Sequence, residues 1–233
     1  MQALIFDYGG TLDTDGRHWA HVLWEGYGEA GVPVTNEQFR EAYVYGERAL
    51  AKAPIVLPED TFRDVLEKKV EQQFAFLQAE HIWNDAPDVC SEELNTVVDY
   101  CHDYALRHIA KAREVLAVLR PKYRMVLVSN FYGNIEAILR DFGLAEYFDA
   151  VIESAVVGVR KPDPEIYRLG VKATGCEAKE VTVIGDSYSK DIVPANAIGC
   201  RTIWLRGEGW SGEDAGDLAG VEITALGDVL RYL

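Results

Sequence analysis

The chain has 233 residues, of which 48% are hydrophobic, enough for one large globular domain or for a core with a smaller companion. The formal net charge of −15 argues against a nucleic acid partner, because phosphate backbones are bound by clusters of lysine and arginine. No apolar run approaches the ~18 residues of a membrane span, so we expect no contact with a membrane.

The first predicted element is a short buried strand, ALIF, which ends at Asp7 and is followed by a glycine-rich turn. Residues 14–109 then show no convincing strand, and their apolar residues recur with helical spacing. A capping-box pattern from Thr35 to Gln38 opens one of these helices. Two further helical segments with a single apolar stripe are predicted at residues 60–77 and 92–109.

From about residue 120 onward, short β-branched runs alternate with helical patterns. Continuous apolar strands that alternate with helices are typical of a parallel sheet covered on both faces. We therefore predict an α/β fold with a doubly wound, Rossmann-like parallel sheet in residues 1–13 and 110–233, and an inserted all-helical segment in residues 14–109. The predicted strands are 124–130, 148–154, 180–187, 200–205 and 220–223, and the predicted helices are 134–143, 163–175, 191–199 and a terminal helix.

Three of the predicted strands end in polar residues. Asp7 closes the first strand, Ser129 and Asn130 close the second, and Asp186 closes the strand at 180–187. Ligands of open parallel sheets bind at the carboxyl ends of the strands, so these groups are expected to face one site. An unpaired carboxylate at the end of a buried strand would be costly, which makes a partner for Asp7 and Asp186 necessary.

Asp191 starts a predicted helix and has two interpretations, a working carboxylate or an ordinary N-cap. Three carboxylates at one edge would repel one another unless a cation lay between them. A hard divalent ion with oxygen ligands, such as Mg²⁺, is the natural neutraliser. Lys161 offers one more positive charge from a loop stiffened by Pro162 and Pro164, unless it is simply a solvated lysine.

These residues carry a resemblance to the haloacid dehalogenase superfamily. DYGGTL at 7–12 resembles the first motif of that family, D-x-D-x-T, and VSN at 128–130 resembles the second. RKPDPEIY at 160–167 resembles the third motif, a lysine ahead of proline, and GDSYSKD at 185–191 resembles the fourth. The motifs occur in the family's order, and the insert resembles the helical C1-type cap of its subfamily I.

The resemblance implies a Mg²⁺-dependent hydrolase, most simply a phosphatase of a small phosphorylated metabolite that forms an aspartyl-phosphate on Asp7. It implies that Ser129 hydrogen-bonds a phosphoryl oxygen and that Lys161 holds the phosphoryl charge beside Asp7. The implied metal ligands are Asp7, the backbone carbonyl of Gly9, Asp186 and Asp191. The residues expected to contact the phosphate or substrate are Gly10, Thr11, Asn130 and Arg17.

Gly9 stands where the family's phosphatases carry a second aspartate, which protonates the leaving oxygen and then activates water. General acid–base catalysis is typically worth about 10²–10⁴ in rate, so this departure leaves three possibilities. The leaving group needs little protonation, as in an acyl or aryl phosphate. Alternatively, another residue serves as the general acid and base, and Asp13, His18 and His21 are the candidates. The third possibility is a reaction other than phosphate ester hydrolysis.

Other activities of the same family remain open. Its L-2-haloacid dehalogenases lack the second aspartate and need no metal, and they resemble this chain at SN in the second motif, but they have an aromatic residue at the position of Gly9. Its phosphonatases use a cap lysine as a Schiff base, for which Lys52, Lys68 and Lys69 are available, although all three are better interpreted as solvated helix faces. A weak or inactive binding protein on this scaffold is the last alternative.

The segment that enters the cap, residues 13–31, is rich in aromatic residues. His18, Trp19 and Trp24 are candidates for an apolar wall of the substrate site, or for inward packing of the cap. The four cysteines form no C-x-x-C pair and the chain shows no basic, apolar leader, so we expect a cytoplasmic protein, either a monomer or a homodimer.

Overall fold

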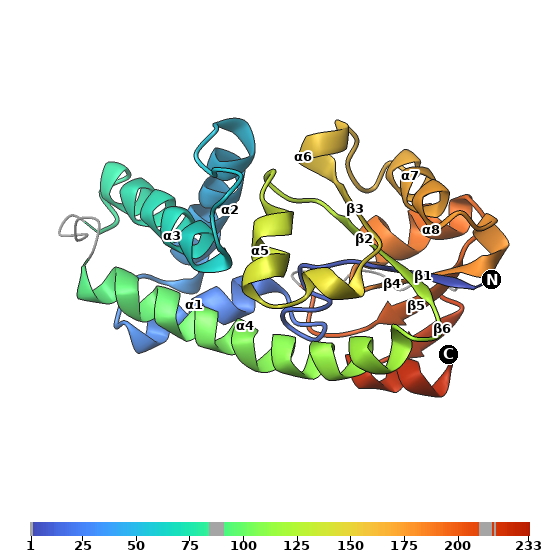
Figure 1. The fold of residues 1–233 in the computed structure, drawn as a ribbon. Coiled ribbons are helices and arrows are strands. Elements are labelled where there is room, and N and C mark those ends of the chain that lie inside the picture. Colours follow the sequence, from blue (N-terminus) through green and yellow to red (C-terminus); the bar gives the residue numbers. More distant parts are fainter. Residues whose placement is uncertain (1, 84–90, 210–215, 217) are drawn as a thin grey trace.

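The structure is a computed structural model that describes residues 2–83, 91–209, 216 and 218–233. A parallel sheet forms one part of the molecule, and a group of helices lies beside it (Figure 1). The sheet has the strand order β3-β2-β1-β4-β5-β6. The strands are β1 (Ala3–Phe6), β2 (Arg124–Ser129), β3 (Ala150–Glu153), β4 (Val181–Gly185), β5 (Arg201–Leu205) and β6 (Val221–Ile223).

Alternate residues of the central strands enter two different cores, because successive side chains of a strand point to opposite faces. Ala3 and Ile5 pack with residues of α7 (Glu165–Thr174) on one face. Leu4 and Phe6 pack on the other face, in a core that continues through α4 (Glu92–Leu119) into the other helices. Both faces of the sheet are therefore covered, as its apolar strands predict.

The helices that follow β2 are α5 (Ile135–Asp141), α6 (Ser154–Val157), α7 (Glu165–Thr174) and α8 (Val193–Ala197), with short 3-10 or π segments η1 (Ala145–Tyr147), η2 (Ala178–Glu180), η3 (Tyr188–Ile192) and η4 (Leu226–Arg231).

Residues 14–109, which we call the cap, contain helices and no strand where the structure describes them. The capping box predicted at Thr35 is present, with the Gln38 N–H donating to the Thr35 hydroxyl and the Thr35 N–H donating to the Gln38 side chain. No helix in the described ranges is long and apolar enough to cross a bilayer. The helices are α1 (Trp19–Glu29), α2 (Asn36–Lys52), α3 (Phe62–Ala79) and α4 (Glu92–Leu119).

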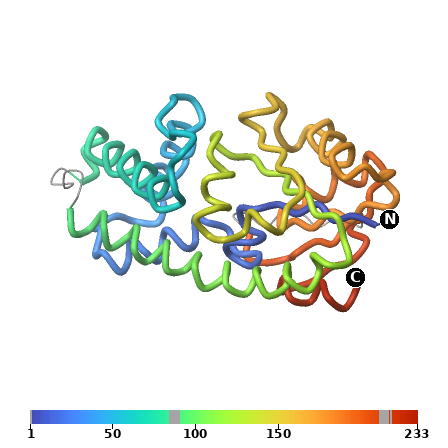
Figure 2. Tube along the Cα trace, viewed as in Figure 1, coloured from blue at the N-terminus to red at the C-terminus, as the bar shows by residue number. Residues whose placement is uncertain are grey.

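Helix α4 joins the two parts of the chain without interruption. It runs beneath both the cap helices and the sheet, and its far end lies beside η4 near the C-terminus (Figures 1 and 2). The predicted helix ends at residue 109, whereas the observed helix continues to Leu119 because buried residues such as Val115 and Leu116 keep the helical spacing. The predicted boundary at residues 109 and 110 therefore falls within one continuous helix.

Candidate active site

A cleft of about 1030 Å³ opens between the cap and the carboxyl ends of the central strands. Its floor contains Asp7 after β1, Ser129 at the end of β2 and Asp186 after β4. These strands are neighbours in the sheet, with β1 between β2 and β4, so the fold itself brings the three residues together. The convergence predicted from the strand ends is therefore observed.

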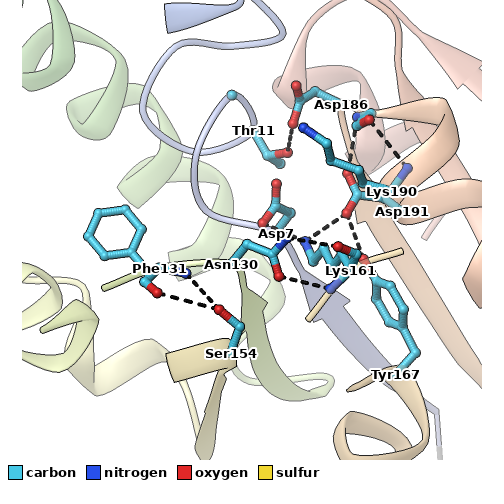
Figure 3. A network of polar contacts seen from close by, with 12 residues as sticks. Asp7, Thr11, Asn130, Phe131, Ser154, Lys161, Tyr167, Asp186, Lys190 and Asp191 are labelled. Carbon is cyan, nitrogen blue, oxygen red and sulfur yellow. Dashed lines mark hydrogen bonds and ion pairs between the residues drawn. The ribbon is translucent and has the colours of Figure 1, made fainter. Parts of the chain in front are cut away.

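Lys161 lies at the centre of the charged groups on this floor (Figure 3). Its Nζ is 2.6 Å from Asp7 Oδ1 and 2.7 Å from Asp191 Oδ1. The side chain of Lys161 is only 2% exposed, so both ion pairs are shielded from water. Tyr167 of α7 donates a hydrogen bond from its hydroxyl to the same oxygen of Asp191, at 2.6 Å. The lysine thus holds the nucleophile candidate and Asp191 in one network.

Asp186 completes an acidic cluster with Asp7 and Asp191. One oxygen from each of the three carboxylates lies within 4.8 Å of the other two. The Thr11 hydroxyl donates to Asp186 Oδ1 at 3.0 Å. Gly10, at φ +93°, is in close contact with the Asp186 carboxylate, so a side chain at position 10 would collide with it. The glycine turn thus lets Asp186 approach the loop that carries Asp7.

The electrostatics of the cluster match those of a cation site. Burial raises the pKa of Asp7 to about 6, although Lys161 acts in the opposite direction. Burial and the nearby carboxylates of Asp7 and Asp191 raise the pKa of Asp186 well above its usual range. Burial alone would lower the pKa of Lys161, but Asp191 and Asp7 raise it overall. Carboxylate oxygens that repel one another at this spacing fit a divalent cation with oxygen ligands.

The side chain of Asn130 forms hydrogen bonds with both the N–H and the carbonyl of Lys161. Its Nδ2 donates to the Lys161 carbonyl at 3.1 Å, and the Lys161 N–H donates to Asn130 Oδ1 at 2.9 Å. The side chain predicted to contact phosphate is therefore used to position the Lys161 loop. Ser129 is buried and lines the same cleft as Asp7, and its contact to a phosphoryl group stays a prediction.

The loop after β1 contains a second buried carboxylate, Asp13. The N–H of Gly10, a residue expected to contact the phosphate, donates to Asp13 Oδ1 at 2.7 Å. Trp19 Nε1 donates to the other oxygen of Asp13 at 2.9 Å. The hydroxyl of Thr11 is likewise occupied by Asp186, so the predicted phosphate contacts of Gly10 and Thr11 remain predictions.

Arg17 is bound by two carboxylates away from the floor of the cleft. Its guanidinium donates two hydrogen bonds to Glu25, at 2.9 and 2.7 Å, and one to Glu208 at 2.9 Å. It is not among the residues that line the cleft. The arrangement gives Arg17 a structural contact between the cap entrance and the loop after β5, and it does not support the predicted contact with substrate.

The aromatic residues of the cap entrance separate into two groups. His18 and Trp19 line the cleft, as the first interpretation of this segment requires. Trp24 packs against Phe39, with ring centroids 5.3 Å apart, as the second interpretation requires. His21 is directed to the carbonyl of Gly209, 3.0 Å from its Nε2.

The cap wall of the cleft carries a partly buried ion pair that the sequence did not indicate. Lys69 of α3 lies 2.6 Å from Glu47 of α2, and the Tyr132 hydroxyl, from the loop after β2, donates to Glu47 at 2.8 Å. The prediction that Lys69 is a solvated residue is wrong, since its side chain is 12% exposed. Burial would lower the pKa of Lys69, but Glu47 raises it overall, so this amine is protonated and unsuited to a Schiff base. Lys68 pairs with Asp60, and Lys52 is exposed.

Two further residues support the floor and were not among the predicted site residues. Tyr167 belongs to the same RKPDPEIY segment as Lys161, and it lies in the first turn of α7, from which its hydroxyl reaches Asp191. Trp204 of β5 donates from Nε1 to the backbone carbonyl of Asp186 at 2.8 Å. Tyr167 could have been found from the sequence, because it lies within the segment that resembles the third motif. Nothing in the pattern around Trp204 distinguishes it from a core residue.

Residues 1–199 match the sequence model of the haloacid dehalogenase-like hydrolases. A glyceraldehyde 3-phosphate phosphatase from Pyrococcus abyssi is 36% identical over 104 residues, which are 43% of each chain. The chain thus spans less than half the length of this curated relative.

Solved structures match over the whole chain at lower identity. A putative hydrolase of this family from Bacillus subtilis, YfnB, bound to magnesium, has a TM-score of 0.61 and 19% identity, covering 100% of this chain and 98% of its own. A dehalogenase with an intermediate complex has a TM-score of 0.66 and 17% identity, covering 100% of this chain and 97% of its own. Because a protein named as a hydrolase and one named as a dehalogenase share this fold, the fold alone does not determine which reaction is catalysed.

Proposed function

Because this chain belongs to the haloacid dehalogenase-like hydrolases, we propose that it is a Mg²⁺-dependent phosphatase of a small phosphorylated metabolite, with Asp7 as the nucleophile. The observation that carries the proposal is the cluster of Asp7, Asp186 and Asp191 around Lys161. A metal-free dehalogenase would leave the repulsion around Asp186 uncompensated, which favours the phosphatase. The division into a core of residues 1–13 and 110–233 and a cap of residues 14–109 is part of this proposal.

In the proposed reaction, a carboxylate oxygen of Asp7 attacks phosphorus, the bond to the leaving oxygen breaks, and water later hydrolyses the aspartyl-phosphate. Lys161, 2.6 Å from Asp7, fixes the orientation of that carboxylate and places a positive charge beside the transferred group. Ser129, which lines the cleft, would donate a hydrogen bond to a phosphoryl oxygen. A Mg²⁺ ion held by Asp7, Asp186, Asp191 and the Gly9 carbonyl would neutralise phosphoryl charge.

The mouth of the cleft favours an anionic substrate, although the molecule as a whole is strongly acidic. Four basic residues lie along its walls and have no carboxylate within 4 Å in the part of the chain that the structure describes. With a cation on the acidic floor, basic side chains without an acidic partner would attract an anionic ligand to the cleft. These residues are Arg48, Lys52, Arg160 and Lys190.

The relative from Pyrococcus abyssi is named for a small phosphorylated aldehyde, which supports a substrate of this size. The cleft of about 1030 Å³ has room for a substrate of this kind together with water. Its cap wall presents the polar groups of Glu47, Lys69 and Tyr132 to whatever is attached to the phosphate. We therefore propose a polar leaving group.

Hydrolysis of p-nitrophenyl phosphate tests the function. We expect turnover with Mg²⁺, loss of turnover in EDTA, and recovery when Mg²⁺ is restored in excess. Asp7→Asn should reduce turnover to background, whereas Asp103→Asn, an exposed carboxylate in α4, should leave it unchanged. Turnover that survives both EDTA and Asp7→Asn would contradict the proposal, and release of chloride from 2-chloropropionate would favour the dehalogenase.

A further inference from the structure

Expulsion of an alkoxide from a phosphate ester needs a proton, and Gly9 offers no side chain to supply it. We propose that Asp13 is the general acid and base of this active site. The inference rests on the proposed phosphatase function and concerns the same cleft.

The position of Asp13 meets the first requirement, which is access to the reacting groups. The residue is 1% exposed and lines the cleft together with Asp7, Gly9 and Gly10. The 2.7 Å hydrogen bond from the Gly10 N–H fixes one carboxyl oxygen against the loop that carries the nucleophile. Asp13 and Asp7 are thus held by one short turn.

The second requirement is a fixed orientation that still leaves room for a proton. Trp19 Nε1 is a donor only, and it holds the other oxygen of Asp13 at 2.9 Å. Each carboxyl oxygen has a second lone pair, so a proton can be carried beside these two hydrogen bonds. Trp19 is the first residue of α1 and lines the cleft, so the cap entrance itself orients the carboxyl group.

The other titratable groups of the cleft wall meet the requirements less well. Burial, and then Lys190, lower the pKa of His18 to about 4, so its imidazole is neutral near pH 7 and lacks the acidic proton of an imidazolium. Glu47 is ion-paired with Lys69 and accepts a hydrogen bond from Tyr132. By contrast, burial raises the pKa of Asp13 to about 7, although hydrogen bonds from Gly10 and Trp19 oppose this. A group of this pKa can give and regain a proton near neutrality.

The proton balance of the two steps is complete. As an Asp7 oxygen bonds to phosphorus, the leaving oxygen takes the electron pair of the broken bond and the proton of Asp13, and departs as an alcohol. Water then attacks the same phosphorus and gives a proton to the Asp13 carboxylate, which releases inorganic phosphate and restores Asp7. No other reactant is required.

Gly9 provides a matched test of this assignment. A Cβ built at this residue would meet nothing within 4 Å, so Gly9→Asp can be introduced into open space at the cleft. If Asp13 supplies the proton that position 9 lacks, a carboxyl group at position 9 should replace it.

The experiment compares two esters with Mg²⁺ present: p-nitrophenyl phosphate, whose leaving group is stable as an anion, and glycerol 2-phosphate, whose alkoxide needs a proton. We expect Asp13→Asn to lower kcat for glycerol 2-phosphate by about 10²-fold and for the aryl ester by less than tenfold. Gly9→Asp in the Asp13→Asn background should restore at least tenfold on the alkyl ester. Thermal melting of each variant reports whether it is folded.

The outcomes separate this assignment from the proposed function. Equal losses on both esters, no loss, or no recovery with Gly9→Asp in a folded protein would show that Asp13 has a structural role only. If the wild-type chain turned over neither ester with Mg²⁺, the phosphatase function and the role of Asp13 would fall together. Turnover of both esters by wild type, lowered selectively on the alkyl ester by Asp13→Asn, supports both.

Discussion

Lys161 is the residue on which the electrostatics of the floor depend. It is the buried cation nearest to Asp7 and Asp191, at 2.6 and 2.7 Å. Two buried carboxylates without a partner would either remain charged at a high cost or take up protons. In the proposed reaction Asp7 acts as a nucleophile in its carboxylate form, so the lysine would preserve this reactive form as well as the position of Asp7.

We therefore expect Lys161→Met to destabilise the fold by about 3 kcal/mol in metal-free buffer, because removing one member of a buried ion pair leaves its partners uncompensated. Urea unfolding at neutral pH measures the change. Lys179→Met is the control, because Lys179 and Glu177 form an exposed pair, for which we expect a change of at most about 0.5 kcal/mol. A loss at position 161 no larger than at position 179 would mean that the buried network contributes little.

At the scale of single residues, the sequence predicted which groups meet but not how they pair. Asp7, Asp186 and Lys161 follow from strand ends and motif order, because the topology of a parallel sheet determines which edge they share. The contacts of Asn130 and Arg17 depend instead on side-chain rotamers and on partners such as Glu208, which is remote in the sequence. No local pattern contains that information.

At the scale of elements, the position of α7 depends on a glycine in its middle. A Cβ at Gly170 would lie 2.8 Å from Val128 Cγ2 and 3.0 Å from Ile5 Cδ1, so the helix packs directly on β1 and β2. The same helix carries Tyr167, whose hydroxyl contacts Asp191. Close packing at Gly170 thus determines how far the tyrosine reaches into the site.

We expect Gly170→Ala to destabilise the protein by about 1–3 kcal/mol, because the added methyl group overpacks a tight contact and outweighs the better helix propensity of alanine. The control is Gly28→Ala in α1, where a Cβ meets nothing within 4 Å. There we expect a gain of about 0.5 kcal/mol. Urea unfolding of both variants gives the signs, and a stabilising Gly170→Ala would contradict the close approach of α7.

Element types were easier to predict than element ends. Each predicted strand of the second half is present, because an apolar run between turn residues has few other solutions in a covered sheet. The predicted end of α4 lies ten residues before the observed end at Leu119. Residues 110–119 belong both to the helix and to the core beneath the sheet. A domain boundary predicted from a change in the sequence pattern therefore need not coincide with the end of a long helix.

For the whole molecule, the active site exists only in the folded chain. Thr11 and Asp186 are 175 residues apart in the sequence, yet they form a hydrogen bond, and the cap lies between β1 and the rest of the sheet in the sequence. An unfolded chain of net charge −15 has no cluster with this geometry. A cation that binds the three carboxylates at the cleft floor therefore binds the folded state preferentially.

We accordingly expect Mg²⁺ to raise the melting temperature of the wild-type chain relative to EDTA. Preferential binding at a free concentration of 100 times Kd stabilises a folded protein by about 2.7 kcal/mol, which is a shift of several degrees. Asp186→Asn removes one ligand and relieves part of the repulsion, so this variant should melt higher than wild type in EDTA and gain less from Mg²⁺. Asp103→Asn, far from the cluster in sequence and exposed on α4, should respond to Mg²⁺ as wild type does. If the wild-type and Asp186→Asn proteins gained equally from Mg²⁺, the ion would be bound elsewhere, and the acidic cluster would need another explanation for its buried charge.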